Sequence, residues 1–189
     1  MGSRDKIIAA AIALFNRADM KSVTTNHIAE AAGVSPGNLY YHFKSKEQIV
    51  RAIFKRMVVD EERACVNCCV DDIDSLSAYY GRLLGVFWRY RFFKREMVFL
   101  LKRDAGLKKE FDLYQERLNA EIETALRGFI AAGIMRPLPD RRFAFLVQNV
   151  ALILNFWLPF CEMSSPRITK ASLKQGLDLI VDLLEVYKA

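Results

Sequence analysis

The chain has 189 residues, of which 52% are hydrophobic; this is too apolar for a disordered protein and long enough to bury a core in one large or two small domains. It contains only 9 glycines and 5 prolines, and its long stretches of Ala, Leu, Glu, Lys and Arg favour helices over strands. The net charge of +6 is concentrated in residues 1–56, which hold 9 Lys/Arg against 4 Asp/Glu, whereas residues 57–189 hold 19 against 18, so the sequence indicates a nucleic acid or another anionic partner for the first segment alone.

We expect a first helix that has Ser3 as its N-cap and runs to Arg17 or Ala18. Its apolar side chains recur at helical spacing and would form one buried face; they are Ile7, Ile8, Ala11, Leu14 and Phe15. This apolar stretch is short and is not followed by a small-residue cleavage site, so we expect that it is not a signal peptide.

The pattern of residues 24–43 predicts a helix-turn-helix. Thr24 or Thr25 caps a second helix, which ends at the glycine of an Ala-Gly-Val turn, where helices often finish in a left-handed conformation. Ser35 then caps a short third helix at Pro36–Phe43, with proline at the first position, where a missing N–H does no harm. Two helices joined by such a tight turn are typical of a DNA-binding unit braced by a further helix.

Helices are expected to the end of the chain. Ser45–Gln48 has the capping-box pattern of a fourth helix, and Asp74 or Ser75 caps the next one. The remaining expected helices are Leu76–Tyr90, Arg95–Arg103, Leu107–Ala132, Asp140–Met163 and a last one from Thr169 or Lys170 to Val186. About nine helices and no strand pattern predict an all-α fold, with an N-terminal three-helix domain at residues 1–56 and a helical domain at residues 57–189.

The segment Phe143–Phe160 is apolar and close to the minimum length of a membrane-spanning helix. Gln148, Asn149 and Asn155 interrupt it, and Pro159 lies near its end. Three amides in hydrocarbon would be costly. We therefore expect a core or interface helix and no membrane span.

The third helix carries residues suited to the major groove of DNA, which its N-terminal end would enter. Pro36 and Gly37 keep that end slim, and Asn38 can form two hydrogen bonds with adenine. Leu39 and Phe43 are four residues apart and should face the core. The polar side chains that could reach DNA are Thr25, Tyr40, Tyr41, His42 and Lys46.

The order of residues in this segment resembles the DNA-binding domain of the tetracycline-repressor (TetR/AcrR) family. The matching signature is Ile-Ala-x-x-Ala-Gly-Val-Ser at residues 28–35, followed by Leu-Tyr-Tyr-His-Phe-Lys-Ser-Lys-Glu at residues 39–47, and the similarity extends over about residues 5–56. The resemblance implies a DNA-binding regulator, usually a repressor, with a variable helical domain for effector binding and dimerisation. By position, it implies DNA contacts at Thr25, Ser35, Gly37, Asn38, Tyr40, Tyr41, His42 and Lys46.

A homodimer would use the last two helices, packed with their copies as a four-helix bundle. This arrangement explains the apolar segment without a membrane, because one helix face would be covered by the core and another by the second copy. Each protomer would place its third helix in one major groove of a palindromic operator, with half-sites about 34–36 Å apart or a multiple of that spacing.

The helices between about residues 76 and 160 hold an aromatic set with few polar anchors, which favours an apolar or aromatic small-molecule effector. The candidate pocket residues are Trp88, Tyr90, Phe99, Tyr114, Asn149, Phe156 and Trp157. Each of them could equally be plain core. Effector binding would favour one of two conformations of the body and so change the separation of the recognition helices.

The cysteines do not predict a metal site or a disulfide framework. They are Cys65, Cys68, Cys69 and Cys161. The first three share one helix face but lack a fourth ligand, because His27 and His42 belong to the predicted DNA-binding unit. We expect packing roles in a reducing, cytoplasmic setting, with a redox switch as the alternative, and no metal or cofactor.

Other functional classes have weaker support. No Ser/His/Asp arrangement, glycine-rich phosphate loop or carboxylate pair predicts an enzyme. The aromatic and basic run at residues 87–95 fits a helix end better than a second nucleic-acid patch. Tyr40 could be partly core, and His42 could be a solvated histidine stabilised by the helix dipole. The competing function is a constitutive DNA-binding or interaction protein of the same fold without an effector.

Overall fold

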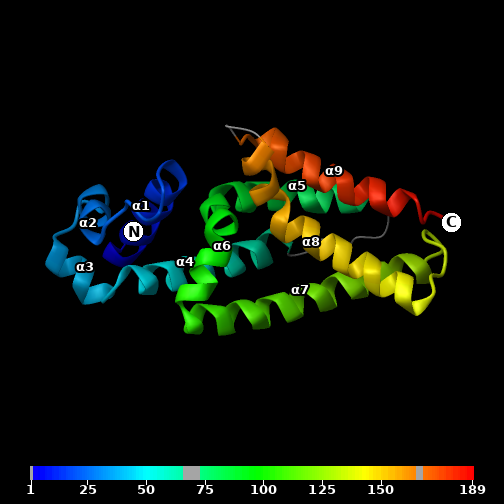
Figure 1. Ribbon diagram of the computed structural model, residues 1–189, viewed down its shortest axis with the longest axis horizontal. Helices are drawn as coiled ribbons and strands as arrows, with labels where there is room; N and C mark the ends of the chain where they lie inside the picture. Colours follow the sequence, from blue (N-terminus) through cyan, green and yellow to red (C-terminus); the bar gives the residue numbers. More distant parts are fainter. Residues whose placement is uncertain (1, 66–72, 165–167) are drawn as a thin grey trace.

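The computed structural model describes residues 2–65, 73–164 and 168–189, and within these ranges the chain forms nine α-helices (Figure 1). The helices are α1 Ser3–Arg17, α2 Thr25–Ala32, α3 Pro36–His42, α4 Lys46–Cys65, α5 Ile73–Arg89, α6 Arg91–Arg103, α7 Ala105–Ala131, α8 Asp140–Ser164 and α9 Lys170–Glu185. Over the same ranges, β pairing is limited to one isolated bridge between Met135 and Lys188. The predicted all-α fold is confirmed.

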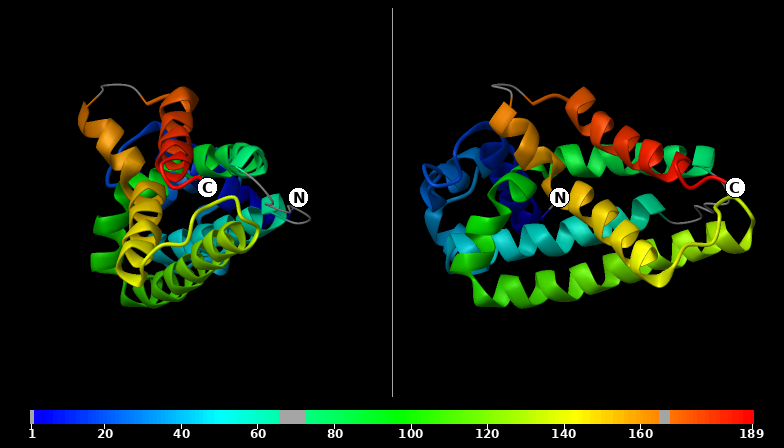
Figure 2. Two further views of the ribbon diagram at one scale, coloured as in Figure 1. Left: turned by 90° about the vertical axis from the view of Figure 1, so that its right-hand side faces the viewer. Right: turned by 45° about the vertical axis from the view of Figure 1, so that its right-hand side comes forward.

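The helices build an elongated molecule, with α1, α2 and α3 at one end and the longer helices of the body at the other (Figure 1). The helix α4 runs from the end unit into the body, and α6 lies where the two meet. In the body, α5 packs along α9, α9 also contacts α8, and α8 contacts α7 (Figure 2). The end unit, which consists of α1, α2 and α3, therefore projects from a larger helical body.

Three helix N-termini lie where the sequence placed them. The side chains of Thr24, Ser35 and Thr169 each accept a hydrogen bond from the backbone N–H three residues on, which satisfies one of the donors that a helix start leaves open. Gly33 ends α2 with a φ of 63°, the left-handed conformation that favours glycine. Caps of this kind depend on neighbours in sequence, so the sequence alone predicts them.

Two other predicted caps are wrong. The N-cap of α1 is Gly2 and not Ser3, which is already the first helical residue. The helix α5 begins at Ile73, so neither Asp74 nor Ser75 caps it. In both cases a cap-forming residue type lies inside the first turn, where polar side chains are also common.

The helix α6 begins at Arg91, one turn before the predicted start at Arg95. The reason is a contact from a distant part of the chain. The side-chain oxygen of Asn16, in α1, accepts a hydrogen bond from the backbone N–H of Phe92 at 3.1 Å. Asn16 thus satisfies a donor of the first turn of α6 that no residue nearby in sequence satisfies.

The end unit shares its hydrophobic core with the body. Phe15 of α1 lies against Phe92 of α6 with 5.1 Å between the ring centroids, and Phe54 of α4 stacks on Phe93 at the same distance. One cluster of buried side chains extends from α1 to α7. The predicted domain boundary after residue 56 falls inside the continuous helix α4, and it stays a prediction.

Among the described residues, α8 is the helix that is long and apolar enough to cross a membrane by length and composition. A core helix of a soluble protein can pass the same test, but only 33% of the apolar window of α8 is buried within this chain. Its exposed apolar residues, called here the α8 stripe, are Phe145, Leu152, Phe156, Phe160 and Met163. The helix thus packs into the body on one side and presents an apolar surface on the other.

The contact between α8 and α9 depends on a glycine. The indole of Trp157 lies against Gly176, and its Nε1 donates to the carbonyl of Ser172 at 2.6 Å. A Cβ at position 176 would lie 2.3 Å from Trp157 Cδ1. We expect Gly176→Ala to lower the free energy of unfolding by about 1–3 kcal/mol, because the indole must move; urea unfolding followed by circular dichroism measures this.

Gly128→Ala is the matched control. Gly128 also lies inside a helix, α7, and a Cβ there would meet no atom within 4 Å. Alanine should raise the free energy of unfolding at this position by up to about 1 kcal/mol through helix propensity. Equal effects of the two substitutions would contradict the proposed role of the Gly176 contact.

Candidate nucleic-acid interface and small-molecule cavity

The leading end of α3 is open to solvent. The hydroxyl of Ser35 accepts a hydrogen bond from Asn38 N at 3.1 Å, and Pro36 occupies the first helical position. Around Gly37, an added Cβ would meet only the Ser35 hydroxyl, at 4.0 Å. The four residues are exposed, so this end combines backbone N–H groups, a slim profile and one free amide, which suits a close approach to phosphates and base edges.

The opposite side of α3 anchors it. Leu39 and Phe43 are buried, as predicted from their spacing. The ring of Phe43 also lies 5.3 Å from the guanidinium of Arg4 in α1. A helix of seven residues cannot hold its shape alone in water, so these contacts make the exposed end of α3 rigid.

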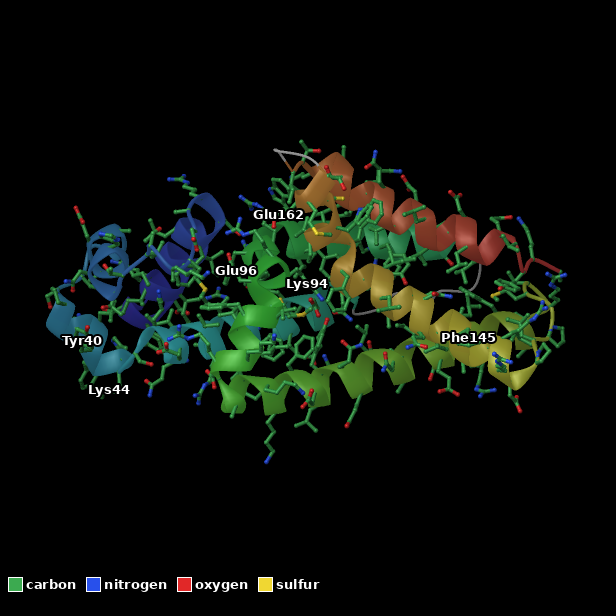
Figure 3. The ribbon with its side chains drawn as sticks, in the orientation of Figure 1. Tyr40, Lys44, Lys94, Glu96, Phe145 and Glu162 are labelled. Atoms are coloured by element: carbon green, nitrogen blue, oxygen red, sulfur yellow. The ribbon has the colours of Figure 1, made fainter. Side chains whose placement is uncertain are left out.

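The aromatic residues of α3 differ in exposure. Tyr41 is 78% exposed, and its ring makes an edge contact with His42. Tyr40 is 44% exposed, and its hydroxyl lies 3.0 Å from the hydroxyl of Thr25 in α2. Thr25 and Tyr40 therefore form one polar surface across the turn. Figure 3 shows Tyr40 at the end of the molecule, with Lys44 beside it.

The basic residue Lys46 faces inward. Its ammonium donates to the carbonyls of Met20 and Val23, each at 2.9 Å, and so ties the start of α4 to the loop between α1 and α2. Lys44, at the end of α3, is exposed, and its ammonium donates to the carbonyl of Tyr40. The bonds to Met20 and Val23 use two of the three N–H donors of the Lys46 ammonium, and the phosphate contact implied for Lys46 stays a prediction.

His27 has a role that the sequence argument missed. Its backbone N–H donates to the Thr24 hydroxyl, and its ring Nδ1 accepts from Thr24 N at 3.4 Å. This is a capping box with histidine in place of the usual glutamate or glutamine. The sequence showed Thr24 and His27 at the spacing of a capping box, but a capping box usually has glutamate or glutamine at the position of His27.

A cavity of about 690 Å³ opens between α7 and α8. The α7 side of the cavity is lined by four polar residues at intervals of four in the sequence: Gln115, Asn119, Glu123 and Arg127. Its α8 wall is mostly apolar, with Phe143, Val147, Ala151, Leu152 and Phe156 beside the amides Gln148 and Asn155, and Met97 and Phe111 close the end nearest α6. The volume is within the range of sites for drug-sized ligands.

The predicted pocket residues are spread over the body. Phe156 lines the α7/α8 cavity. Phe99 lines a second cavity of about 270 Å³ where α6 meets the end unit, and Trp157 lines one of about 30 Å³ between α8 and α9. The others line none of these three cavities: Tyr90 and Tyr114 are buried, Trp88 is half-buried under the guanidinium of Arg91, and Asn149 is exposed. The pocket assignment by residue therefore stays a prediction.

Lys94 and Glu61 are buried charged groups of the body; Lys94 lines the cavity of about 30 Å³ and donates to Asn155, which lines the α7/α8 cavity. Lys94 is 6% exposed, and burial lowers its pKa while the charge of Glu61 opposes this shift. Burial raises the pKa of Glu61, and Lys94 opposes that shift. Tyr114 lies beside Glu61, and burial raises the pKa of its hydroxyl well above the usual value. Burial thus favours the neutral forms of Lys94 and Glu61, whereas the charge of each favours the ionised form of the other; at Tyr114 the charge of Glu61 adds to burial and raises the pKa further.

In the described part of the chain, no group of three or more His, Cys, Asp or Glu side chains could hold a metal ion. Cys161 is a free, buried cysteine, and burial raises the pKa of its thiol. Of the predicted cysteine cluster, Cys65 is the last residue of α4, while Cys68 and Cys69 lie outside the described residues. The redox alternative stays a prediction.

A braced helix-turn-helix with an exposed leading end, carried on a larger helical body, is typical of DNA-binding regulatory proteins. The chain belongs to the tetR family. The family model of bacterial regulatory proteins of the tetR family matches residues 7–53, and a model described as bacterial transcriptional repressor matches residues 44–189. The suspected resemblance is confirmed.

Individual relatives are similar over different lengths. A crystal structure of a TetR-family transcriptional regulator from Marinobacter aquaeolei VT8 has a TM-score of 0.88 and 30% identity, covering 100% of this chain and 92% of that one. The transcriptional regulator LmrA of Bacillus subtilis is 30% identical over 57% of this chain and 60% of its own length. The transcriptional repressor KstR2 of Mycolicibacterium smegmatis is 40% identical, but over only 28% of this chain and 25% of its own length.

Asn38 and Tyr41 should differ in their effects on DNA binding. We expect Asn38→Ala to relax sequence preference at one base position, because an amide reads base edges, at a loss of about 1–3 kcal/mol for the preferred base. Tyr41→Phe should weaken binding similarly on all sequences, because a hydroxyl on phosphate carries no sequence information. Fluorescence anisotropy on matched duplexes separates the two; Leu113→Ala, on the exposed side of α7, is the control.

Lys46→Met should act on stability. The substitution removes two hydrogen bonds from an ammonium to buried-side carbonyls, so we expect the free energy of unfolding to fall by about 1–3 kcal/mol. The slope of log Kd against log salt should stay unchanged, whereas loss of a phosphate contact would change it by about 0.9. A changed slope without a loss of stability would assign Lys46 to DNA instead.

Proposed function

We propose that this protein is a homodimeric transcriptional repressor that binds a palindromic operator and releases it when a small molecule binds the body. The observation that supports DNA binding best is the exposed, rigidly anchored end of α3, with Asn38 and Gly37 at its tip. The excess of cations in residues 1–56 supports the same partner. Residues 1–56 would form the DNA-binding part of a cytoplasmic protein, and residues 57–189 the part for effector binding and dimerisation.

The α8 stripe supports the homodimer. Phe145 is 51% exposed and Met163 is 81% exposed, although both are large and apolar. Leu179 of α9 and Val186, the residue after it, are further exposed apolar side chains. A contiguous exposed apolar surface of this kind marks an interaction site, and a second copy would cover it with the same residues in an isologous four-helix bundle.

The α7/α8 cavity supports an effector over the constitutive alternative. Its volume of about 690 Å³ and its mixed apolar and polar walls suit a small molecule. An effector can change DNA affinity only through a difference in its affinity for the two conformations of the body. One experiment on the whole protein therefore tests both the predicted half-sites of the operator and the predicted response to an effector.

The experiment is selection of duplexes from a random pool by the full-length protein, followed by sequencing. We expect enrichment of an inverted repeat whose half-site spacing corresponds to about one helical turn or a multiple of it. Enrichment without inverted symmetry would contradict the dimeric mode, and no enrichment at all would contradict sequence-specific binding. A selected duplex that no small molecule releases would favour the constitutive alternative.

The dimer interface is testable without touching the cavity. Phe145 and Met163 belong to the α8 stripe but do not line the α7/α8 cavity. We expect Phe145→Lys combined with Met163→Lys to convert the dimer to monomer at micromolar concentration, because charges of one sign would be buried against an apolar surface. Sedimentation velocity measures this.

Leu113→Lys is the control for this pair, because Leu113 is 60% exposed but lies on α7, outside the stripe. It should remain dimeric. A double variant that stays dimeric, with helix content unchanged by circular dichroism, would place the interface elsewhere.

A further inference from the structure

A second cavity lies where the end unit meets the body. It has a volume of about 270 Å³, is called here the junction cavity, and shares none of its described lining residues with the α7/α8 cavity. Its walls come from the loop between α1 and α2, the first turns of α4, the second half of α6 and the start of α7. Figure 1 shows α6 where the end unit and the body meet. A molecule bound in this cavity would therefore touch both parts of the chain.

The inner wall of the junction cavity is apolar. Met20 and Val50 line it from the α1–α2 loop and from α4, and Leu100 and Leu107 line it from α6 and α7. Each of these four side chains is at most 6% exposed. The half-buried ring of Phe99 completes the wall. The volume lies just below the range of sites for drug-sized ligands, so the cavity suits a smaller apolar group of about one or two fused rings.

Two exposed cations at the rim of the junction cavity have no anionic partner among the described residues. The Lys21 ammonium lies 4.9 Å from the centre of the Phe99 ring, and the Arg103 guanidinium carbon lies 5.3 Å from the same centre. The two charges are thus at most about 10 Å apart, the two distances taken together. Like charges held near one ring repel each other, and an anion between them would turn this repulsion into attraction.

Two other charged residues of the cavity wall already have partners. The Lys46 ammonium donates to two backbone carbonyls of the α1–α2 loop, each at 2.9 Å. The buried Asp104 carboxylate accepts from Arg51 at 2.7 Å and from two backbone N–H groups in the first turn of α7. These two groups hold the walls of the cavity together, and the cations left for a ligand are Lys21 and Arg103.

Glu47 sets the charge that a ligand can carry. Hydrogen bonds from its own backbone N–H and from Ser45 lower the pKa of its carboxyl, and the charge of Arg103 lowers it further. Glu47 is therefore ionised at neutral pH, yet it forms no ion pair with either rim cation in the described part of the chain. Two cations opposed by one carboxylate accommodate one further negative charge better than two.

We propose that the junction cavity binds a small amphipathic monocarboxylate, with its apolar group on the inner wall and its carboxylate between Lys21 and Arg103. A guanidinium matches a carboxylate with two parallel hydrogen bonds, and the lysine ammonium adds a third donor group. This site is separate from the proposed effector cavity and does not depend on the proposed function, because none of its residues lines that cavity.

The ligand class is tested by calorimetry on the full-length protein at pH 7.5 with two probes of one ring system, 2-naphthoate and 2-naphthylmethanol. We expect 2-naphthoate to bind at sub-millimolar concentration. Lys21→Met combined with Arg103→Met should weaken its binding at least tenfold, because charge-assisted hydrogen bonds to the carboxylate are lost. The alcohol should not distinguish the two proteins, because only the carboxylate meets the rim cations.

Lys102→Met combined with Arg127→Met is the matched control, since it removes the same charge. Lys102 lies in the last turn of α6 beside Arg103 but does not line the junction cavity, and Arg127 lines the α7/α8 cavity. This control should bind 2-naphthoate as the native protein does. Weaker binding by the control alone would place the carboxylate in the α7/α8 cavity and overturn the proposal.

Glu47→Gln gives a test that misfolding cannot imitate. Removal of the opposing charge should tighten 2-naphthoate binding by about threefold, the size expected for one exposed charge interaction. If the double variant of the rim loses helix content by circular dichroism, Arg103→Gln alone replaces it and should weaken binding at least threefold. The proposal is overturned if 2-naphthoate does not bind at millimolar concentration, if the rim variant binds it like the control, or if Glu47→Gln leaves its affinity unchanged or lower.

Discussion

The contact on which the rest of the structure depends is the side chain of Asn16 at the end of α1. Its amide donates to the carbonyl of Arg89 at 2.7 Å, and its oxygen accepts from Phe92 N at 3.1 Å. One side chain thus joins α1 to the last residue of α5 and to the first turn of α6. The position of the end unit on the body is therefore defined by hydrogen bonds and not only by apolar packing.

Around this contact, α6 acts as the connection between two cores. Phe92 and Phe93 pack toward α1 and α4, while Lys94 bonds Asn155 of α8. Arg95 lies close to Glu162 of α8, 3.7 Å between the nearest charged atoms, as well as to the end of α1. Figure 3 shows Glu96 and Glu162 on neighbouring parts of α6 and α8. One short helix thereby contacts both the end unit and the wall of the α7/α8 cavity.

The sequence predicted what local patterns and the family motif determine. The caps at Thr24 and Ser35, the start of α9, the buried positions of Leu39 and Phe43, and the tetR-family class all follow from residues close together in the chain. Two predicted helix caps were wrong, Ser3 for α1 and Asp74 or Ser75 for α5, because these cap-forming residue types lie inside the first turn.

The body was harder to predict because its features arise from distant residues. The start of α6 depends on Asn16, and the inward direction of Lys46 depends on two carbonyls more than twenty residues away in the chain. Two of the aromatic residues predicted for the pocket, Tyr90 and Tyr114, are buried in the core instead, since aromatic side chains are common there. The polar wall of α7 had a visible signal, Gln115, Asn119, Glu123 and Arg127 at intervals of four, but exposed helix faces have the same spacing.

The proposed dimer interface and the proposed ligand cavity share two residues of α8. Leu152 and Phe156 belong to the α8 stripe and also line the α7/α8 cavity. In a dimer formed through α8, a second copy would lie against the outer edge of this cavity, so a bound molecule would alter the surface that the partner contacts. By linkage, any effect of the ligand on dimerisation is matched by an equal effect of dimerisation on ligand affinity. In the proposed function, the apolar surface of α8 would therefore connect assembly to ligand binding.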